Sequence, residues 1–217
     1  MKEKGRLSFM QSHFPCGVFP KGAIHEFICR EPSEIAVTGG FIAALIDSVF
    51  HSAGTIIWIS QGKHIFPATL QLFNIDPSRI IFIHPSSSKE CLWVIEEALK
   101  CNGLHAVIAE MKELSFVHSR RYQLAVESSN VTGFLMNMKP GKEDTTACVS
   151  KWQIHSLPSE TYGDMPGVGH PRWKVSLTKM RNGKPGQWEL EWVNGKITHI
   201  QQEDLDWLDE TIHQQTG

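Results

Sequence analysis

The 217-residue sequence lacks several features that would assign it to a familiar class of protein. No apolar run approaches the roughly 18 residues of a membrane-spanning helix, so we expect no association with a membrane. The first 17 residues contain no apolar segment of the kind found in secretory signals. The five cysteines form no C-x-x-C motif and no pairing pattern, which fits a reducing compartment. These absences predict a cytoplasmic protein.

An excess of charge of one sign is also missing. The chain has 21 Lys and Arg against 23 Asp and Glu, which gives a net charge of -2. Proteins that bind nucleic acids mainly through phosphate contacts need a basic surface, because that binding depends on the release of counterions. The sequence therefore predicts weak or no direct nucleic-acid binding.

Motifs for catalysis are absent as well. The eleven histidines include no H-E-x-x-H pair. There is no G-x-S-x-G elbow, and no Ser/His/Asp or Cys/His set occurs locally. We therefore expect no metal site, no cofactor and no enzymatic activity.

Strand and helix patterns alternate through the first two thirds of the chain. Near-continuous apolar runs typical of buried parallel strands occupy residues 23–29, 54–60, 79–84, 105–111 and 132–138. Helical spacing of apolar residues, or a Ser cap, predicts helices over residues 35–53, 67–73, 89–101 and 115–129. This rhythm is typical of βαβ units with right-handed crossovers and a parallel sheet.

The pattern changes after residue 138. Residues 147–157, 172–179 and 187–193 alternate between apolar and polar side chains, which predicts an antiparallel hairpin region at one edge of the sheet. The tryptophans of these strands favour cross-strand packing over base stacking; they are Trp152, Trp173, Trp188 and Trp192. Trp58 and Trp93 lie in apolar runs and are expected in the core.

The first predicted strand, loop and helix have the shape of a phosphate-binding unit without its chemistry. The connector at residues 30–35, REPSEI, contains two acids, no Gly and no Lys. None of the four Gly-Lys pairs in the chain fits the phosphate-loop template G-x-x-x-x-G-K-[ST]. Thr38-Gly39-Gly40 is interpreted as a site of close helix–strand packing. Glu110, at the end of the fourth strand, is interpreted as a structural carboxylate paired with a neighbour rather than a magnesium ligand.

Four segments together point to a known family: residues 19–26 (FPKGAIHE), 105–110 (HAVIAE), 119–127 (SRRYQLAVE) and 171–192 (PRWKVSLTKMRNGKPGQWELEW). With these segments the chain resembles the ImuA family of RecA-like proteins, which is associated with damage-induced, error-prone translesion DNA synthesis. The resemblance implies a RecA-like core without ATPase competence. It also implies that the protein acts in a mutagenic complex with an inactive Y-family polymerase-like partner and an alternative replicative-type polymerase.

The predicted fold is α/β: a RecA-like, mostly parallel sheet flanked by helices, extended by an antiparallel hairpin and without a functional phosphate loop. Residues 1–200 form this domain, with an irregular and partly mobile stretch at residues 1–18, and residues 201–217 form a tail. The short linkers after residues 110 and 138 stand where RecA carries its DNA-binding loops. No helix comparable to the filament-docking helix of RecA is expected before residue 14.

The function predicted from this resemblance is a non-catalytic accessory subunit of a translesion synthesis complex that acts through protein–protein interaction. One alternative is a RecA-like regulator of cell division or of recombinase activity that lacks ATPase activity. An unrecognised ATPase or other enzyme is a further alternative. Besides the polymerase-like protein, the candidate partners are the replicative-type polymerase, RecA and the sliding clamp.

Two arginines of the predicted helix over residues 115–129 are candidate partner-binding residues. Arg120 and Arg121 are adjacent, and adjacent helix positions differ by about 100° around the axis. We expect one to lie against the sheet edge while the other faces solvent or a partner. The alternative is that both are ordinary surface residues.

The tail is the second candidate for partner binding. Leu205, Leu208 and Ile212 have the spacing of one helix face, and Trp207 lies beside it. We predict that this segment docks on another protein with Trp207 and Leu208 as anchors, since large apolar residues tend to dominate interface energy. The polymerase-like partner is the first candidate and the sliding clamp the second. Disorder, or a helix folded back on its own sheet, is the alternative.

Overall fold

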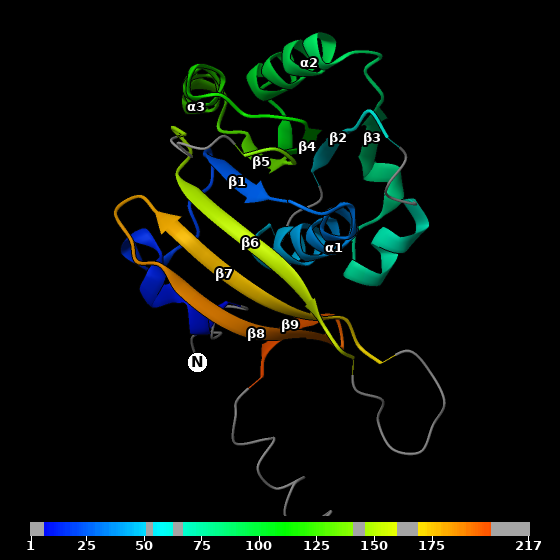
Figure 1. Ribbon diagram of the computed structural model, residues 1–217, viewed down its shortest axis with the longest axis vertical. Coiled ribbons are helices and arrows are strands. Elements are labelled where there is room, and N and C mark those ends of the chain that lie inside the picture. Colours follow the sequence, from blue (N-terminus) through cyan, green and yellow to red (C-terminus); the bar gives the residue numbers. More distant parts are fainter. Residues whose placement is uncertain (1–6, 51–53, 63–66, 141–145, 160–168, 201–217) are drawn as a thin grey trace, which may run out of the picture.

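The computed structural model describes residues 7–50, 54–62, 67–140, 146–159 and 169–200 (Figure 1). The strands in this part of the chain form a nine-stranded sheet with the order β3-β2-β4-β5-β1-β6-β7-β8-β9. The first five strands pair in parallel; they are β1 (Ile24–Ile28), β2 (Thr55–Ile59), β3 (Ile80–Ile83), β4 (Leu104–Met111) and β5 (Thr132–Asn137). The predicted α/β class with a mostly parallel sheet is confirmed.

Helices cover both faces of the parallel strands, which explains why these strands are apolar along their whole length. Helix α1 (Pro32–Val49) lies on one face, and α2 (Ser88–Lys100) and α3 (Phe116–Ser129) lie side by side on the other (Figure 1). Two hydrophobic cores result, one on each face of the sheet. Two short 3-10 helices, η3 (Pro67–Phe73) and η4 (Pro77–Arg79), connect β2 to β3.

The helix ends follow local capping chemistry. Ser87 accepts a hydrogen bond from the backbone N–H of Glu90 at the start of α2, and Ser115 accepts one from that of His118 at the start of α3. Helix α1 begins at Pro32 rather than at the expected Ile35, because proline suits the first helical position. It ends at Val49, four residues before the expected end.

Helix α1 is the one helix among the described residues that is long and apolar enough to cross a membrane by composition. Of its 18-residue window, 61% is buried inside the fold. Its apolar character therefore has a direct explanation in the core. Gly40, in this helix, approaches the ring of Phe73 from η3, so a Cβ at Gly40 would lie 3.2 Å from that ring. Helix–strand packing was predicted at Thr38-Gly39-Gly40, but the close approach at Gly40 is to η3 and not to a strand.

The antiparallel region joins the parallel sheet through one strand that pairs in both senses. Strand β6 (Ser150–Leu157) is parallel to β1 and antiparallel to β7 (Arg172–Met180). The strands β8 (Gly186–Val193) and β9 (Lys196–His199) continue the antiparallel order. The β8–β9 connection uses Asn194-Gly195, both with positive φ, which matches the backbone that a tight hairpin demands.

The sequence predicted packed positions for six tryptophans, and five of them are buried in the structure. Trp58 is buried in the parallel core, and Trp152, Trp173, Trp188 and Trp192 are buried on the antiparallel strands. The core prediction for Trp93 is wrong: its side chain is 63% exposed on α2. The buried positions of α2 are Cys91, Ile95, Ala98 and Leu99, so Trp93 falls out of phase with the face that meets the sheet.

The first described residues form two short 3-10 helices, η1 (Ser8–His13) and η2 (Pro15–Gly17). Met10 and Phe14 are buried and belong to the core shared with α1 and the antiparallel strands. The nitrogen Nδ1 of His13 lies 2.8 Å from the carbonyl oxygen of Pro185 in the turn between β7 and β8. This stretch, expected to be irregular, is therefore anchored to the sheet from Leu7 onward.

Candidate functional site

The connection from β1 to α1 is held by a side chain from the first turn of the helix. The Oε2 atom of Glu34 accepts hydrogen bonds from the backbone N–H groups of Arg30, at 2.6 Å, and Glu31, at 3.2 Å. Backbone N–H groups at a helix start are the usual donors to a bound phosphate. The carboxylate of Glu34 therefore satisfies two backbone donors at the start of α1.

The other carboxylate oxygen of Glu34 reaches into the antiparallel part of the sheet. Its Oε1 atom lies 3.1 Å from Nδ1 of His155 on β6, while the side chain of Glu34 is only 15% exposed. The loop predicted at residues 30–34 is shorter in the structure, because only Arg30 and Glu31 of that range precede the helix. A first turn with proline and an acid fixes this local structure, because negative charge is favourable near a helix N-terminus.

Glu110 has the structural role that was predicted for it. Its carboxylate is buried at the end of β4 and accepts hydrogen bonds from Trp58 Nε1, at 3.1 Å, and Ser60 Oγ, at 2.8 Å. Both donors come from β2 and the residue after it, so the acid ties two neighbouring strands together. In a nucleotide-binding relative of this fold an acid here would face magnesium, whereas here its oxygens are held by side chains.

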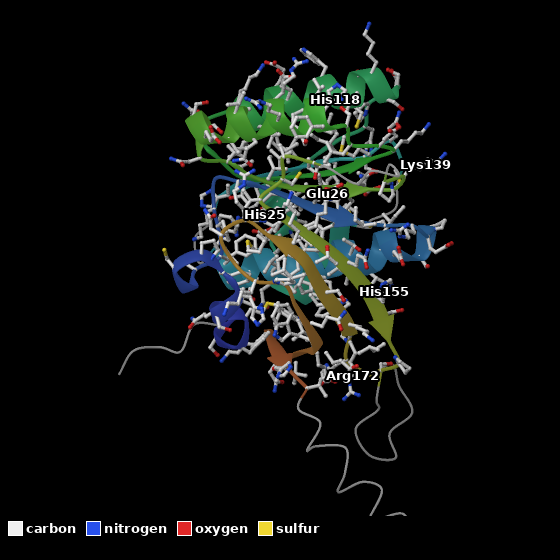
Figure 2. The ribbon with its side chains drawn as sticks, turned by 60° about the vertical axis from the view of Figure 1, so that its left-hand side comes forward. His25, Glu26, His118, Lys139, His155 and Arg172 are labelled. Atoms are coloured by element: carbon white, nitrogen blue, oxygen red, sulfur yellow. The ribbon has the colours of Figure 1, made fainter. Side chains whose placement is uncertain are left out.

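A second buried acid was missed at the sequence level. Glu26 on β1 accepts hydrogen bonds from Asn137 Nδ2, at 2.8 Å, and Thr146 Oγ1, at 2.6 Å. The ammonium group of Lys151 on β6 lies 3.7 Å from the same carboxylate, and both side chains are almost fully buried. Figure 2 shows the position of Glu26 within the fold. The only sequence signal was an acid inside the apolar strand AIHEFIC. Such a charge needs partners, which here come from more than 110 residues away.

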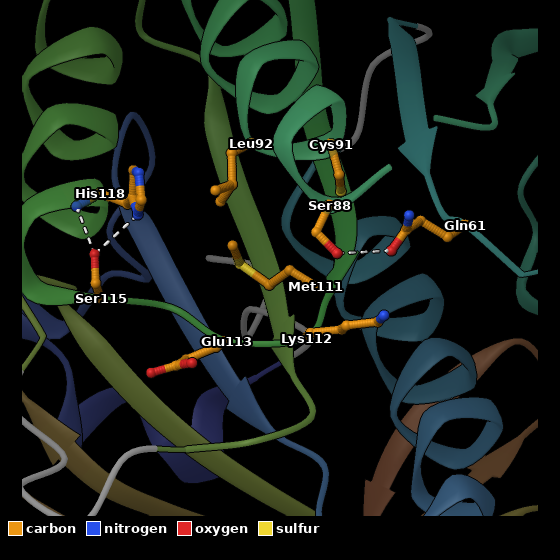
Figure 3. Close-up of a pocket in the computed structure, with 9 residues that line it drawn as sticks. All are labelled: Gln61, Ser88, Cys91, Leu92, Met111, Lys112, Glu113, Ser115 and His118. Atoms are coloured by element: carbon orange, nitrogen blue, oxygen red, sulfur yellow. Dashed lines mark hydrogen bonds between the residues drawn. The ribbon is translucent and has the colours of Figure 1, made fainter. Parts of the chain in front are cut away.

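A cleft of about 410 Å³ opens at the ends of β2 and β4, between the N-termini of α2 and α3 (Figure 3). Its lining includes Lys112 and Glu113, which carry opposite charges, and His118, whose Nδ1 lies 2.8 Å from Ser115 Oγ. The helix starts beside it are already capped by serine side chains. The described residues contain no group of three or more His, Cys, Asp or Glu that could hold a metal ion.

The outer face of α2 and α3 carries an unusual share of exposed apolar side chains. Trp93 on α2 and Phe116, Val117 and Leu124 on α3 are each at least half exposed. We call this set the α2–α3 surface. The hydroxyl of Tyr122 donates to the carbonyl of Leu92, which holds the two helices together beneath it. Contiguous exposed apolar patches commonly mark protein–protein interfaces, so these four residues are candidates for such a role.

The two predicted arginines lie on this surface and differ in their contacts. Arg121 forms an ion pair with Glu96 of α2 at 2.6 Å, and its side chain is 56% exposed. Arg120 is exposed and forms no hydrogen bond or ion pair with another described side chain. The expectation that one of them lies against the sheet edge is wrong, because both project from the outer face of α3. Leu205, Trp207, Leu208 and Ile212 lie outside the described residues, so their role stays a prediction.

Comparison with known proteins agrees with the resemblance, although no family model matches the chain. The Protein ImuA of Caulobacter vibrioides, from strains NA1000/CB15N and ATCC 19089/CIP 103742/CB 15, is 30% identical over 190 residues. That match covers 82% of this chain and 78% of the relative. The crystal structure of the RadB recombinase has a TM-score of 0.61 at 15% identity, over 93% of this chain and 100% of that chain. At that identity the likeness shows a shared RecA-like fold. The chain therefore belongs to the ImuA family.

Proposed function

We propose that this protein is a non-catalytic, RecA-like accessory subunit of a damage-induced, error-prone translesion synthesis complex. Membership of the ImuA family supports a role in translesion synthesis. The hydrogen bonds of Glu34 support the proposal that the protein has no ATPase activity. A carboxylate hydrogen-bonded to the N–H groups of Arg30 and Glu31 competes with a phosphate for the same donors and repels its charge. The sequence offers no phosphate-loop Lys to offset that repulsion.

Nucleotide titration tests the non-catalytic part directly. Isothermal titration of the full chain with ATP and Mg²⁺ should show no binding in the micromolar range, and a malachite-green assay should show no phosphate release above buffer. A P-loop ATPase measured in the same buffer is the positive control. Micromolar affinity for ATP would overturn the proposal that the phosphate position is closed.

We further propose that the α2–α3 surface binds the polymerase-like partner of the family. Trp and Arg are the residues most often found at interface hot spots, and Trp93 and Arg120 are both exposed here. Val117 and Leu124 lie at i and i+7 on α3, with Arg120 and Arg121 between them on the same outer face. An apolar stripe with a central cation suits a partner surface that is apolar and carries an acid.

Co-purification with an inactive Y-family polymerase-like protein from the same cells tests the surface. Trp93→Ala combined with Leu124→Ala should weaken the complex by about tenfold or more, because two exposed anchors are lost. The matched control is Leu72→Ala, which removes a side chain of similar exposure from η3, on the opposite face of the sheet. Circular dichroism confirms folding of each variant. Unchanged affinity of the double variant would exclude the α2–α3 surface as the interface.

A further inference from the structure

The outer stripe of α2 carries charges that are arranged symmetrically about one tryptophan. Lys89 lies four residues before Trp93 and Glu97 lies four residues after it, so the three side chains share one helix face. All three residues are exposed, and Trp93 is 63% exposed. The rise of an α-helix places a residue four positions away about 6 Å along the axis. A cation and an acid therefore flank the tryptophan at equal distances on opposite sides.

This stripe is complementary to a second copy of itself in the opposite direction. When two such helices pack antiparallel with Trp93 at the centre, the Lys89 of each copy lies opposite the Glu97 of the other. The two indole rings then meet at the centre, where aromatic pairs favour offset or edge-to-face contact. Glu97 also pairs with Lys100 of its own helix at 2.9 Å, but a carboxylate has two oxygens and accepts from more than one cation. The stripe thus has the self-complementarity that a two-fold interface requires.

Helices α2 and α3 run side by side in the same direction (Figure 1). The hydroxyl of Tyr122, in the first half of α3, donates to the carbonyl of Leu92, in the first half of α2. The hydroxyl of Ser129, the last residue of α3, donates to the carbonyl of Leu99, next to the last residue of α2. Positions equally far from the two helix starts therefore lie at a similar level.

The apolar residues of α3 fit the same two-fold axis. Trp93 lies five residues after the first residue of α2, and the midpoint between Val117 and Leu124 lies between four and five residues after the first residue of α3. Both points are about 7 Å from their helix starts. An antiparallel pair centred on Trp93 therefore places Val117 of each copy opposite Leu124 of the other. Arg121 lies near this axis, where its ion pair with Glu96 at 2.6 Å offsets its charge.

The size of this face indicates how strongly two copies bind. Helices of 13 and 14 residues are about 20 Å long, and two adjacent helices are about 20 Å wide, which gives a face of about 400 Å². Each partner in a stable complex buries about 800 Å². Self-association through α2 and α3 is therefore weak and reversible, and a partner that makes a larger contact replaces it.

We propose that, without its partner, the protein pairs its α2–α3 surface with that of a second copy in a two-fold, antiparallel dimer. The dimer covers the apolar side chains that are exposed in the single chain. A regulatory consequence rests on the proposed function: the polymerase-like protein binds the same surface and must displace the second copy. The dimer itself rests on the residues of this chain alone.

An exchange of charges, followed by analytical ultracentrifugation over a concentration series of the full chain, tests the proposal. Lys89→Glu places acids opposite each other at both contacts, and Glu97→Lys places lysines there. Each variant alone should weaken self-association about tenfold or more, because like charges then meet across the interface. A mixture of the two variants restores opposite charges at both contacts and should dimerise about as strongly as the unaltered protein.

The two variants should fold, because an acid near the start of a helix and a cation near its end are both favourable to the helix dipole. Circular dichroism checks this. Lys196→Glu is the matched control, since it reverses an exposed charge on β9 and should leave self-association unchanged.

Three outcomes overturn the proposal. The first is an unaltered protein that stays monomeric over the whole series. The second is a mixture that associates no more strongly than each variant alone. The third is equal weakening by Lys196→Glu, because the effect would then be one of general charge. None of these measurements contains the polymerase-like protein, so a failed dimer leaves the proposed partner site standing, and a failed co-purification leaves the dimer standing.

Discussion

Replacing Glu34 by Ala tests the closed phosphate position most sharply. The substitution removes the carboxylate that holds the backbone N–H groups of Arg30 and Glu31 at the start of α1. Loss of a side chain that caps a helix start costs about 0.5–2 kcal/mol. Both N–H groups are accessible to water, which replaces part of the lost bonding. The contact with half-exposed His155 adds little, since exposed pairs contribute about 0–1 kcal/mol.

The expected cost is therefore about 1–2 kcal/mol of unfolding free energy, measured by urea denaturation followed by circular dichroism. For a chain of this size the same change lowers Tm by about 2–8 °C. The unfolding free energy of Glu34→Gln should lie between those of Glu34→Ala and the unaltered protein, because the amide oxygen still accepts a hydrogen bond but carries no charge. The adjacent exposed Ser33→Ala is the control and should change stability by less than about 0.5 kcal/mol.

A second measurement separates phosphate competition from simple capping. With the carboxylate gone, the freed N–H groups form an anion site at the start of a helix. Sulfate should then raise the Tm of Glu34→Ala more than that of the unaltered protein, with chloride at matched ionic strength as the reference. If Glu34→Ala is as stable as the parent, or gains nothing from sulfate, the carboxylate does not occupy an anion position.

Three further predictions follow from the described residues. Arg120→Ala should weaken partner binding in a pull-down without changing Tm, whereas Arg121→Ala should lower stability by at most about 1 kcal/mol through its ion pair with Glu96. Burial lowers the pKa of His25 to about 4 from its ordinary value of 6.5. The unfolded chain therefore binds the proton first as the pH falls, and stability decreases by up to about 3 kcal/mol from pH 6.5 to 4. His25→Gln should flatten that part of the urea-derived pH profile. Single-stranded DNA should bind the isolated protein with no submicromolar affinity in fluorescence anisotropy at physiological salt, given the net charge of -2.

The strands and most helix ends were predictable because their signals are local. Buried parallel strands are apolar along their length, and Ser87 and Ser115 are strong cap residues. The exposure of Trp93 was also predictable from the sequence, since Trp93 does not share a helix face with Cys91 and Ile95 on α2. The core prediction for Trp93 relied on the apolar run and ignored the helical period.

The bonds of Glu34 had a partial signal. Glu31 precedes the helix and Glu34 follows Glu31 by three residues, which is the spacing of a capping box. The prediction of a loop over residues 30–34 missed this signal. The contact to His155 had no signal, because a pairing across 121 residues depends on how the sheet brings β6 beside α1. The same holds for Glu26 with Lys151, which lie 125 residues apart in the sequence and meet because β1 pairs with β6.

Three acids in or beside the parallel strands support the proposal that this protein is not driven by nucleotide binding. Glu34, Glu110 and Glu26 are each held by donors within the chain. No buried side-chain nitrogen or oxygen in the described part of the protein lacks a hydrogen-bond partner. A ligand shifts a conformational equilibrium only by the difference in its affinity for the two states. Under the proposed function, Glu34 satisfies the donors at the start of α1, so ATP gains little in either state. The same proposal places any change of state in partner binding at the surface, which is where the exposed apolar residues of α2 and α3 lie.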